Sequence, residues 1–195
     1  MERRQERSEW IWDGGRTCID LVNTVRSRWE GGEELLPGPA DLGEWLRQAG
    51  LTEVAPAVTA RQFDEAKELR EAIDEGLRAT IDRRPVPGPA VDLINAWTAR
   101  GRQPPAILHL DEHGVPHAQR PAPVSPTPAA LAAIAEDAVL LLGTPDRDRL
   151  RICESPDCSL RFADHSPGRR RQWCSMSRCG NRAKARAHRQ RHRSG

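Results

Sequence analysis

The hexapeptide CESPDC at residues 153–158 and its counterpart CSMSRC at residues 174–179 decide how the C-terminal part of this chain folds. Each hexapeptide begins and ends with cysteine, and fifteen residues separate the two. A zinc ion takes four thiolates at about 2.3 Å in a tetrahedron, and two short loops can close around one ion. The spacing therefore predicts a structural Zn²⁺ site without an open coordination position, formed by Cys153, Cys158, Cys174 and Cys179.

Other uses of these cysteines compete with zinc. An iron–sulfur cluster takes the same thiolates, although arginine-rich surroundings are more typical of a zinc finger. Four free thiols, or a site in which His165 replaces one cysteine, are further alternatives. Cys18 lies far away in an apolar stretch and is expected to be a packed core thiol. Because so small a module buries little apolar surface, the metal should supply much of its stability, helped by Phe162, Trp173 and a strand over 150–152.

Charge is divided unevenly along the 195 residues. Up to Thr144 there are 16 Lys and Arg against 23 Asp and Glu, a net charge of −7, whereas from Pro145 there are 14 against 5, a net charge of +9. Such opposite halves predict two units with different tasks. We therefore predict an N-terminal domain over residues 1–145 and a zinc module over residues 146–195.

A basic segment rich in alanine and arginine follows Gly180. It favours a helix, in which arginines at steps of four, three and four residues share one face. Arginine binds phosphates with two hydrogen bonds, and phosphate contact releases counterions from a polyanion. We therefore expect nucleic-acid contacts from this helix and from the arginines before the second cysteine pair, through Arg169, Arg170, Arg171, Asn181, Arg182, Lys184, Arg186, Arg189 and Arg193. The alternative is a solvated helix that only improves solubility.

The N-terminal domain is predicted to be mainly helical. Capping-box patterns predict helices whose N-caps are Asp41 and Thr59, and further helices are expected over 91–99 and from Thr127 as N-cap. Residues 107–118 fit a short β-hairpin with glycine at its turn, and the prolines of residues 121–128 predict an extended connector. The expected fold class is α+β, mainly α: a helical N-terminal domain with a short β-hairpin, plus a small C-terminal zinc-knuckle module ending in a basic helix.

Polar and aromatic residues near the N-terminus have two interpretations. Asp20, Asn23 and Thr24 lie among apolar residues, where they either cap a helix internally or line a pocket. Tryptophan at helical spacing is more often core than a ligand-binding wall, and this applies to Trp10, Trp12, Trp29 and Trp45. A pocket here would accept an unidentified small-molecule or protein effector.

Several function classes receive no support from the sequence. The charged N-terminus is not followed by the apolar core of a signal peptide, and no apolar run approaches the length that crosses a bilayer. We therefore expect a cytoplasmic protein with no membrane partner. No carboxylate pair, nucleophile motif or phosphate-binding loop predicts an enzyme. His109, His113 and His117 would form a second metal site only in a helix, and the glycine and proline beside them favour a hairpin.

The sequence CSMSRCGNRAK at residues 174–184 resembles the signature of the CGNR zinc-finger family, named after residues 179–182. The first cysteine pair and the segment between the pairs match it too, through Phe162, Asp164, Ser166, the arginine cluster and Trp173. The sequence CIDLVNT at residues 18–24 resembles the opening of ABATE, the N-terminal domain of this family. The resemblance implies zinc at the four cysteines, DNA binding by the C-terminal module and stress-induced transcription regulation.

Three uses of the basic helix remain open at this point. A DNA-binding regulator is favoured, and its binding should fall steeply as salt rises. The same charges would serve an RNA-binding or ribosome-associated module, although single-strand binders usually expose stacking aromatics. A protein-interaction module with an acidic partner is the third.

Overall fold

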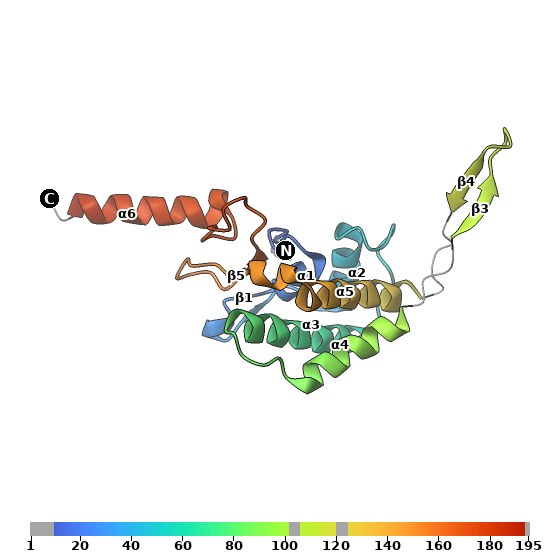
Figure 1. Cartoon of the computed structure of the whole chain (residues 1–195), viewed down its shortest axis with the longest axis horizontal. Helices are drawn as coiled ribbons and strands as arrows, with labels where there is room; N and C mark the ends of the chain where they lie inside the picture. The colour runs from blue at the N-terminus through green and yellow to red at the C-terminus, as the bar shows by residue number, and fades with distance from the viewer. Residues whose placement is uncertain (1–9, 102–105, 120–124, 194–195) are drawn as a thin grey trace, which may run out of the picture.

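The computed structural model describes residues 10–101, 106–119 and 125–193, without the side chains of residues 187 and 191–193. Figure 1 shows a helical body from which two elements project in opposite directions: the hairpin of β3 (Ile107–Leu110) and β4 (Pro116–Gln119), and helix α6 (Asn181–Arg193). The helices of the body are α1 (Thr17–Val22), α2 (Pro39–Gln48), α3 (Ala60–Ile81), α4 (Gly88–Arg100) and α5 (Pro126–Gly143).

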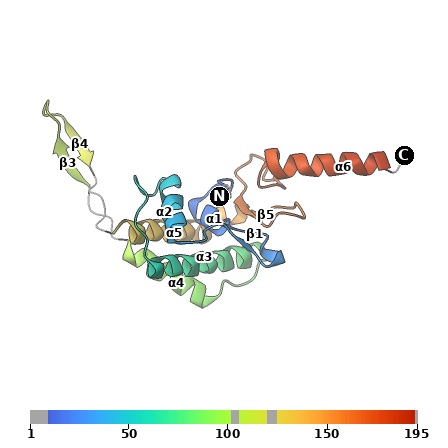
Figure 2. The ribbon, with the colours of Figure 1, turned by 180° about the vertical axis from the view of Figure 1, so that it is seen from behind.

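The long helices α3, α4 and α5 pack against one another, and α1 contacts both α3 and α5. Figure 2 shows the same arrangement from behind, with α2 beside α5. The packed faces form one core, whose largest fully buried side chains include Trp45, Leu69, Ile73, Leu77, Trp97, Leu131 and Ile134. Cys18 is fully buried in this core, as expected. A mainly helical body with short β-pairs confirms the predicted fold class.

Short elements connect this body to the cysteine-containing region. Near the N-terminus they are β1 (Val25–Arg26), the 3-10 turn η1 (Arg28–Glu30) and β2 (Glu33–Glu34), and β1 pairs with β2. After α5 they are the 3-10 turn η2 (Pro145–Arg149), β5 (Leu150–Ile152), β6 (Arg161–Ala163) and the π-helical turn η3 (Met176–Gly180). β5 is the strand expected over 150–152, and it pairs antiparallel with β6. Leu150 and Ala163 belong to the core of the body, so the domain division at residues 145 and 146 stays a prediction.

Helix α3 forms as its sequence predicts. The Thr59 hydroxyl accepts a hydrogen bond from the Gln62 backbone (3.2 Å), and the Gln62 side chain accepts one from the Thr59 backbone (2.9 Å). This capping box satisfies two amides that the first turn leaves without helical partners. The apolar stripe from Phe63 to Leu77 faces the core and is buried.

Three predicted helix starts are wrong by two or three residues, and one of them is that of α4, which begins at Gly88 rather than at residue 91. α2 begins at Pro39 with Gly38 as N-cap, so Asp41 lies in the first turn rather than at the cap. α5 begins at Pro126 with Ser125 as N-cap, and Thr127 is buried inside the first turn. Proline suits the first helical position because its φ is already helical and its missing N–H is not needed there. In α2 and α5 the earlier proline therefore sets the start. Residues 121–124 of the expected connector lie outside the described residues.

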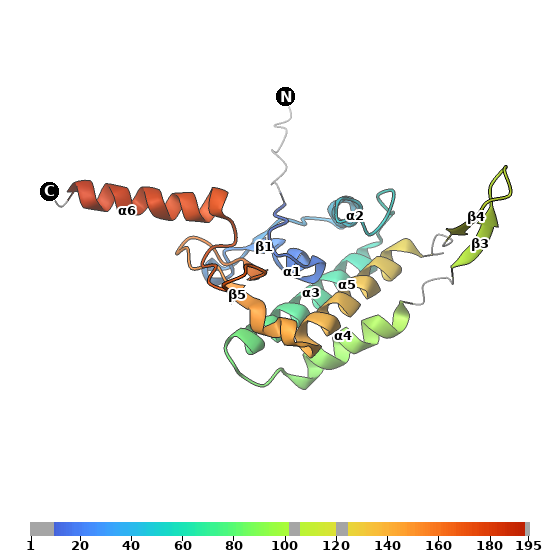
Figure 3. The same cartoon turned by 45° about the horizontal axis from the view of Figure 1, so that its top comes forward.

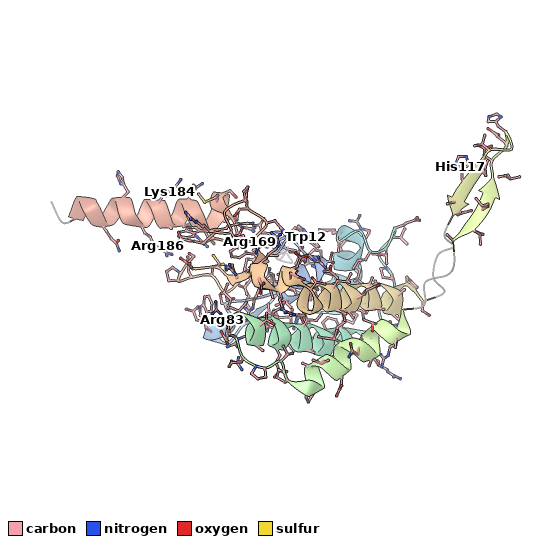
Figure 4. The ribbon with its side chains drawn as sticks, in the orientation of Figure 1. Trp12, Arg83, His117, Arg169, Lys184 and Arg186 are labelled. Carbon is pink, nitrogen blue, oxygen red and sulfur yellow. The ribbon has the colours of Figure 1, made fainter. Side chains whose placement is uncertain are left out.

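The predicted hairpin forms as β3 and β4. It projects from the body, and all eight of its strand residues are exposed. Gly114 in its turn has a φ of +74°, a conformation that favours glycine. His109 lies opposite His117 across the strands, and His117 contacts Asp111 at 2.9 Å. Among the described residues, these histidines do not form a metal-binding group. Figure 4 shows His117 far from the cysteine-containing region.

Helix α5 corrects one expectation about apolar runs. By length and composition it is apolar enough to cross a membrane. Its apolar character has another explanation, because Leu131, Ile134, Ala138 and Leu141 are buried against the neighbouring helices. A core helix passes the same test as a membrane span, so α5 is weak evidence for a membrane protein.

The tryptophans pack against one another and against the body. Trp45 is buried, Trp12 stacks on it with ring centroids 5.4 Å apart, and Trp10 donates a hydrogen bond to the Leu35 carbonyl (3.0 Å). This fits the core interpretation for Trp45 and for the partly buried Trp10, whereas Trp12 is 40% exposed. Trp29 is half exposed.

Candidate metal centre and nucleic-acid surface

The four cysteines between β5 and α6 converge on one point. Their Sγ atoms all lie within 4.8 Å of one another, with 3.7 Å between Cys158 and Cys174 and 3.6 Å between Cys174 and Cys179. A tetrahedron with zinc–sulfur bonds of about 2.3 Å has edges of about 3.8 Å. All four side chains are buried. The donors, their spacing and their burial therefore fit one Zn²⁺ ion.

Local backbone hydrogen bonds shape the two cysteine loops. In the first, the Cys153 amide donates to the Leu160 carbonyl and the Cys158 amide donates to the Ser155 carbonyl, both at 2.9 Å. In the second, the Cys179 amide donates to the Ser175 carbonyl at 3.0 Å within η3. The Glu154 amide donates to the Gln172 carbonyl (2.9 Å), which joins the two loops. These hydrogen bonds turn each loop so that its second cysteine lies close to its first.

The crowded thiols cannot all ionise without a cation. A hydrogen bond from Cys158 lowers the pKa of Cys153 far below its usual range, while the bond with Cys153 raises the pKa of Cys158 to about 12. Hydrogen bonds to Cys153 and Cys158 also raise the pKa of Cys174 strongly. These contacts favour the thiolate at Cys153 and disfavour it at Cys158 and Cys174. Four thiolates in this space require a bound cation, which would hold the loops together.

A small apolar core surrounds the cysteines. It contains Leu160, the fully buried Phe162 and the partly buried Trp173, and Ile11 packs on it from the N-terminal segment. This confirms the expected roles of Phe162 and Trp173. His165 is exposed and is not among the four clustered ligands.

Arg171, one of the expected nucleic-acid contacts, lies within the module's own packing. Its guanidinium sits over the Phe162 ring, 4.9 Å from the centroid. It donates hydrogen bonds to the Trp173 carbonyl (2.8 Å) and to the Cys174 carbonyl. Its backbone amide donates to buried Asp164 at 2.9 Å. Arg171 therefore stabilises the loop that leads into the second cysteine pair, whereas its neighbours Arg169 and Arg170 are exposed.

Helix α6 leaves the second cysteine loop without a break. Arg182 donates to the Cys179 Sγ atom (3.2 Å), and Arg182 and Arg186 contact the Asp157 carboxylate at 3.5 and 2.8 Å. Asp157 lies inside the first cysteine loop, so both loops fix the base of the helix. Lys184 and Arg189 are exposed, and Figure 4 shows Lys184 and Arg186 on the helix beyond the body.

The other expected contact residues on α6 have different surroundings. Asn181 is exposed, and its side chain donates to the Ser177 carbonyl at 3.2 Å. Arg193 belongs to the last turn of the helix, and its side chain lies outside the described residues. The shared arginine face therefore divides into a base that contacts the cysteine loops and a more distal, exposed part at Arg189.

Two family models match the chain. ABATE, described as "Putative stress-induced transcription regulator", matches residues 15–145, and the CGNR zinc finger matches residues 149–192. The chain belongs to the ABATE family. Both matches confirm the resemblance seen in the sequence, and with the clustered cysteines they identify zinc as the cofactor. A search of curated proteins found no match to the chain.

The ABATE body and the zinc finger are joined through Asn23, which follows α1. Its side-chain amide donates to the Arg161 carbonyl and its side-chain carbonyl accepts from the Arg161 amide, both at 2.9 Å. Asn23 therefore neither caps its own helix through its side chain nor lines a pocket. Two neighbouring side chains form local hydrogen bonds. The Thr24 hydroxyl donates to the Leu21 carbonyl (2.7 Å), and the Asp20 carboxylate accepts from the Gly14 amide (2.8 Å).

Buried charges reinforce this junction. The Arg161 guanidinium contacts the Asp74 carboxylate of α3 at 2.7 Å, and both side chains are buried. Asp74 also lies 3.4 Å from Arg28, which pairs with Glu71 at 2.6 Å. Sequence reasoning missed these residues because Arg161 and Asp74 are 87 positions apart. The one available signal was the charge of Arg161 between the apolar residues Leu160 and Phe162.

Proposed function

We propose that this ABATE-family protein is a cytoplasmic DNA-binding transcription regulator that presents helix α6 to the duplex. The observation that carries this proposal is the geometry of α6. The helix starts on the two cysteine loops, is tied to them through Asp157, and projects away from the acidic body. A fixed direction matters for entry into a groove and has no use in a solubility tail.

The dimensions and charges of α6 support the proposal. Its 13 residues form a rod about 20 Å long and about 10–12 Å wide, which suits a major groove about 12 Å wide. The C-terminal part from Pro145 carries a net +9. Such an excess attracts a polyanion over distances set by the Debye length.

The expected contacts divide into two groups under this proposal. Arg169, Arg170, Lys184, Arg189 and Arg193 bind phosphates, and Asn181 lies at the start of the helix, where base edges are read in several helix-based readers. Arg182 and Arg186 keep guanidinium hydrogens beyond those used by Asp157 and add to phosphate binding. Arg171 contributes by holding the loop.

The test is duplex DNA binding by the zinc-loaded full chain as salt is raised. The double variant Lys184→Gln/Arg189→Gln removes two exposed charges of α6. Its affinity at low salt should fall at least about tenfold, and the slope of log K against log salt should drop by about 1.8. The matched control is Arg61→Gln/Arg83→Gln, which removes one exposed charge from the first turn of α3 and one just after its C-cap. This control should bind like the parent chain.

Two outcomes would overturn the proposal. One is an absence of salt-sensitive binding to duplex DNA by the zinc-loaded protein. The other is tighter binding of single-stranded RNA than of duplex DNA at equal salt, which would favour an RNA-binding module. Nuclease treatment before a pull-down distinguishes nucleic-acid binding from binding to an acidic protein. A partner held through nucleic acid is lost after the treatment, whereas a directly bound protein is retained.

A further inference from the structure

A groove of about 730 Å³ runs along the surface between α3 and α4, in the acidic half of the molecule. Its apolar lining includes Ala72, Ala90 and Leu93. Small side chains at such positions let another helix approach closely. Figure 1 shows α4 beside α3 at the lower edge of the body.

One rim of the groove is a stripe of carboxylates on α3. Asp64, Glu68, Glu71 and Glu75 follow one another at steps of four, three and four residues, so they share one helix face. Asp64 pairs with Lys67 at 2.8 Å, and Glu71 pairs with Arg28 and Arg70. Within the described ranges, Glu68 and Glu75 form no ion pair, and both are exposed.

The basic stripe of α6 repeats the spacing of the acidic stripe. Arginines at 182, 186, 189 and 193 also follow steps of four, three and four residues. At 1.5 Å per residue each stripe is about 16 Å long, so the two stripes match in length. Asp157 already holds Arg182 and Arg186, so Arg189 and Arg193 are the residues that would meet the acidic stripe. Ala183, half-buried, and Ala185 keep the backbone of α6 approachable between the basic side chains.

The α6 helix of the same molecule cannot enter its own groove. The ion pairs of Arg182 and Arg186 with Asp157 fix its base at the cysteine loops. Figure 1 and Figure 3 both show α6 extending away from α3 and α4. A second molecule has no such restriction.

We propose that the α3–α4 groove of one copy binds helix α6 of a second copy. The contact is electrostatic at the rim and apolar at the floor, so it should weaken as salt rises. It would cover the basic residues of α6 in the free protein. The effect of this coverage on DNA binding rests on the proposed function, whereas the self-association itself does not.

The experiment is sedimentation of the full zinc-loaded chain, freed of nucleic acid, at about 50 mM and about 500 mM salt. The parent chain should associate at low salt and be monomeric at high salt. The groove variant Glu68→Gln/Glu75→Gln should raise the dissociation constant at least about tenfold. The helix variant Arg189→Gln/Arg193→Gln, which removes the two stripe residues beyond the Asp157 pairs, should do the same. The matched control, Glu53→Gln/Glu136→Gln, changes two exposed carboxylates outside the groove and should associate like the parent chain.

A chain that stays monomeric at low salt overturns the proposal, and so does association that survives the groove variant. Both results leave DNA binding intact, because that is measured separately. The opposite case is also informative. If the groove variant stops associating but the parent chain does not bind DNA, the docking is supported and the proposed function is overturned. If both hold, the groove variant should bind duplex DNA more tightly than the parent chain, since its α6 is no longer covered.

Discussion

The ABATE body and the CGNR zinc finger are stabilised by different means. The body buries a continuous apolar core drawn from α1 to α5, and area removed from water stabilises it by about 25 cal/mol per Å². The buried cluster of the zinc finger consists of four cysteines with Leu160 and Phe162. Apolar burial alone cannot hold so small a unit. The comparison predicts that one chain combines a part stabilised by its apolar core with a part that depends on an ion.

The two regions also use charge differently. The body is acidic on its surface and the zinc finger is basic, yet they meet through a buried pair of opposite charges, Asp74 and Arg161. A buried pair of this kind contributes little net stability but is costly to break. It therefore fixes how the zinc finger sits on the body, and through it the direction of α6.

Removal of zinc should have the largest effect, because it should destabilise the zinc finger and leave the body folded. Chelation, or Cys174→Ser, should remove about 10 kcal/mol of stabilisation from the zinc finger. Amide hydrogen exchange should lose protection over residues 153–180 while α3 stays protected, because its core does not involve the metal. Protection of the cysteine loops in a chain shown to be free of metal would contradict this expectation.

Breaking the buried pair is the next largest effect. Asp74→Asn leaves the Arg161 guanidinium buried beside a neutral group, and the free energy of unfolding should fall by about 3–5 kcal/mol. Urea unfolding measures the change. Asp82→Asn, which affects the exposed pair with Arg84 at the end of α3, should leave the midpoint nearly unchanged. Equal effects of the two variants would show that the junction is not fixed by its charges.

The pH dependence of stability should depend on Asp20. Burial raises the pKa of Asp20 to about 7, so between about pH 4 and pH 7 the folded chain holds a proton that the unfolded chain releases. The free energy of unfolding therefore falls as pH rises across this window. Asp20→Asn should stabilise the chain at pH 8 by about 2–4 kcal/mol and should lose this advantage by about pH 4. Thermal unfolding of both proteins across the pH range measures this. A stability difference between the variant and the parent chain that does not change with pH would contradict the role of the buried charge.

The smallest expected effect concerns the base of α6. Asp157→Asn removes the acceptor of two partly exposed ion pairs, so global stability should fall by less than about 1 kcal/mol. Hydrogen exchange over residues 181–186 should nevertheless become faster, with zinc content unchanged. Asp148→Asn, an exposed carboxylate in η2, serves as the control. Unchanged exchange in the Asp157 variant would mean that the cysteine loops alone direct the helix.

The sequence by itself determined the local elements and the metal site. The capping box at Thr59, the apolar stripe of α3 and the matched cysteine spacing are short-range patterns, and short-range geometry is what residue spacing encodes. Helix starts at Asp41 and Thr127 were misplaced because Pro39 and Pro126, two and one residues earlier, suited the first helical position better.

Only the tertiary structure decided how these parts combine. It turned Asn23 toward Arg161, paired Arg161 with Asp74, withdrew Arg171 into the packing of the zinc finger and tied Arg182 and Arg186 to Asp157. These contacts join residues up to 138 positions apart. Periodicity and spacing describe neighbours along the chain, whereas such partners depend on which surfaces the packed helices bring together.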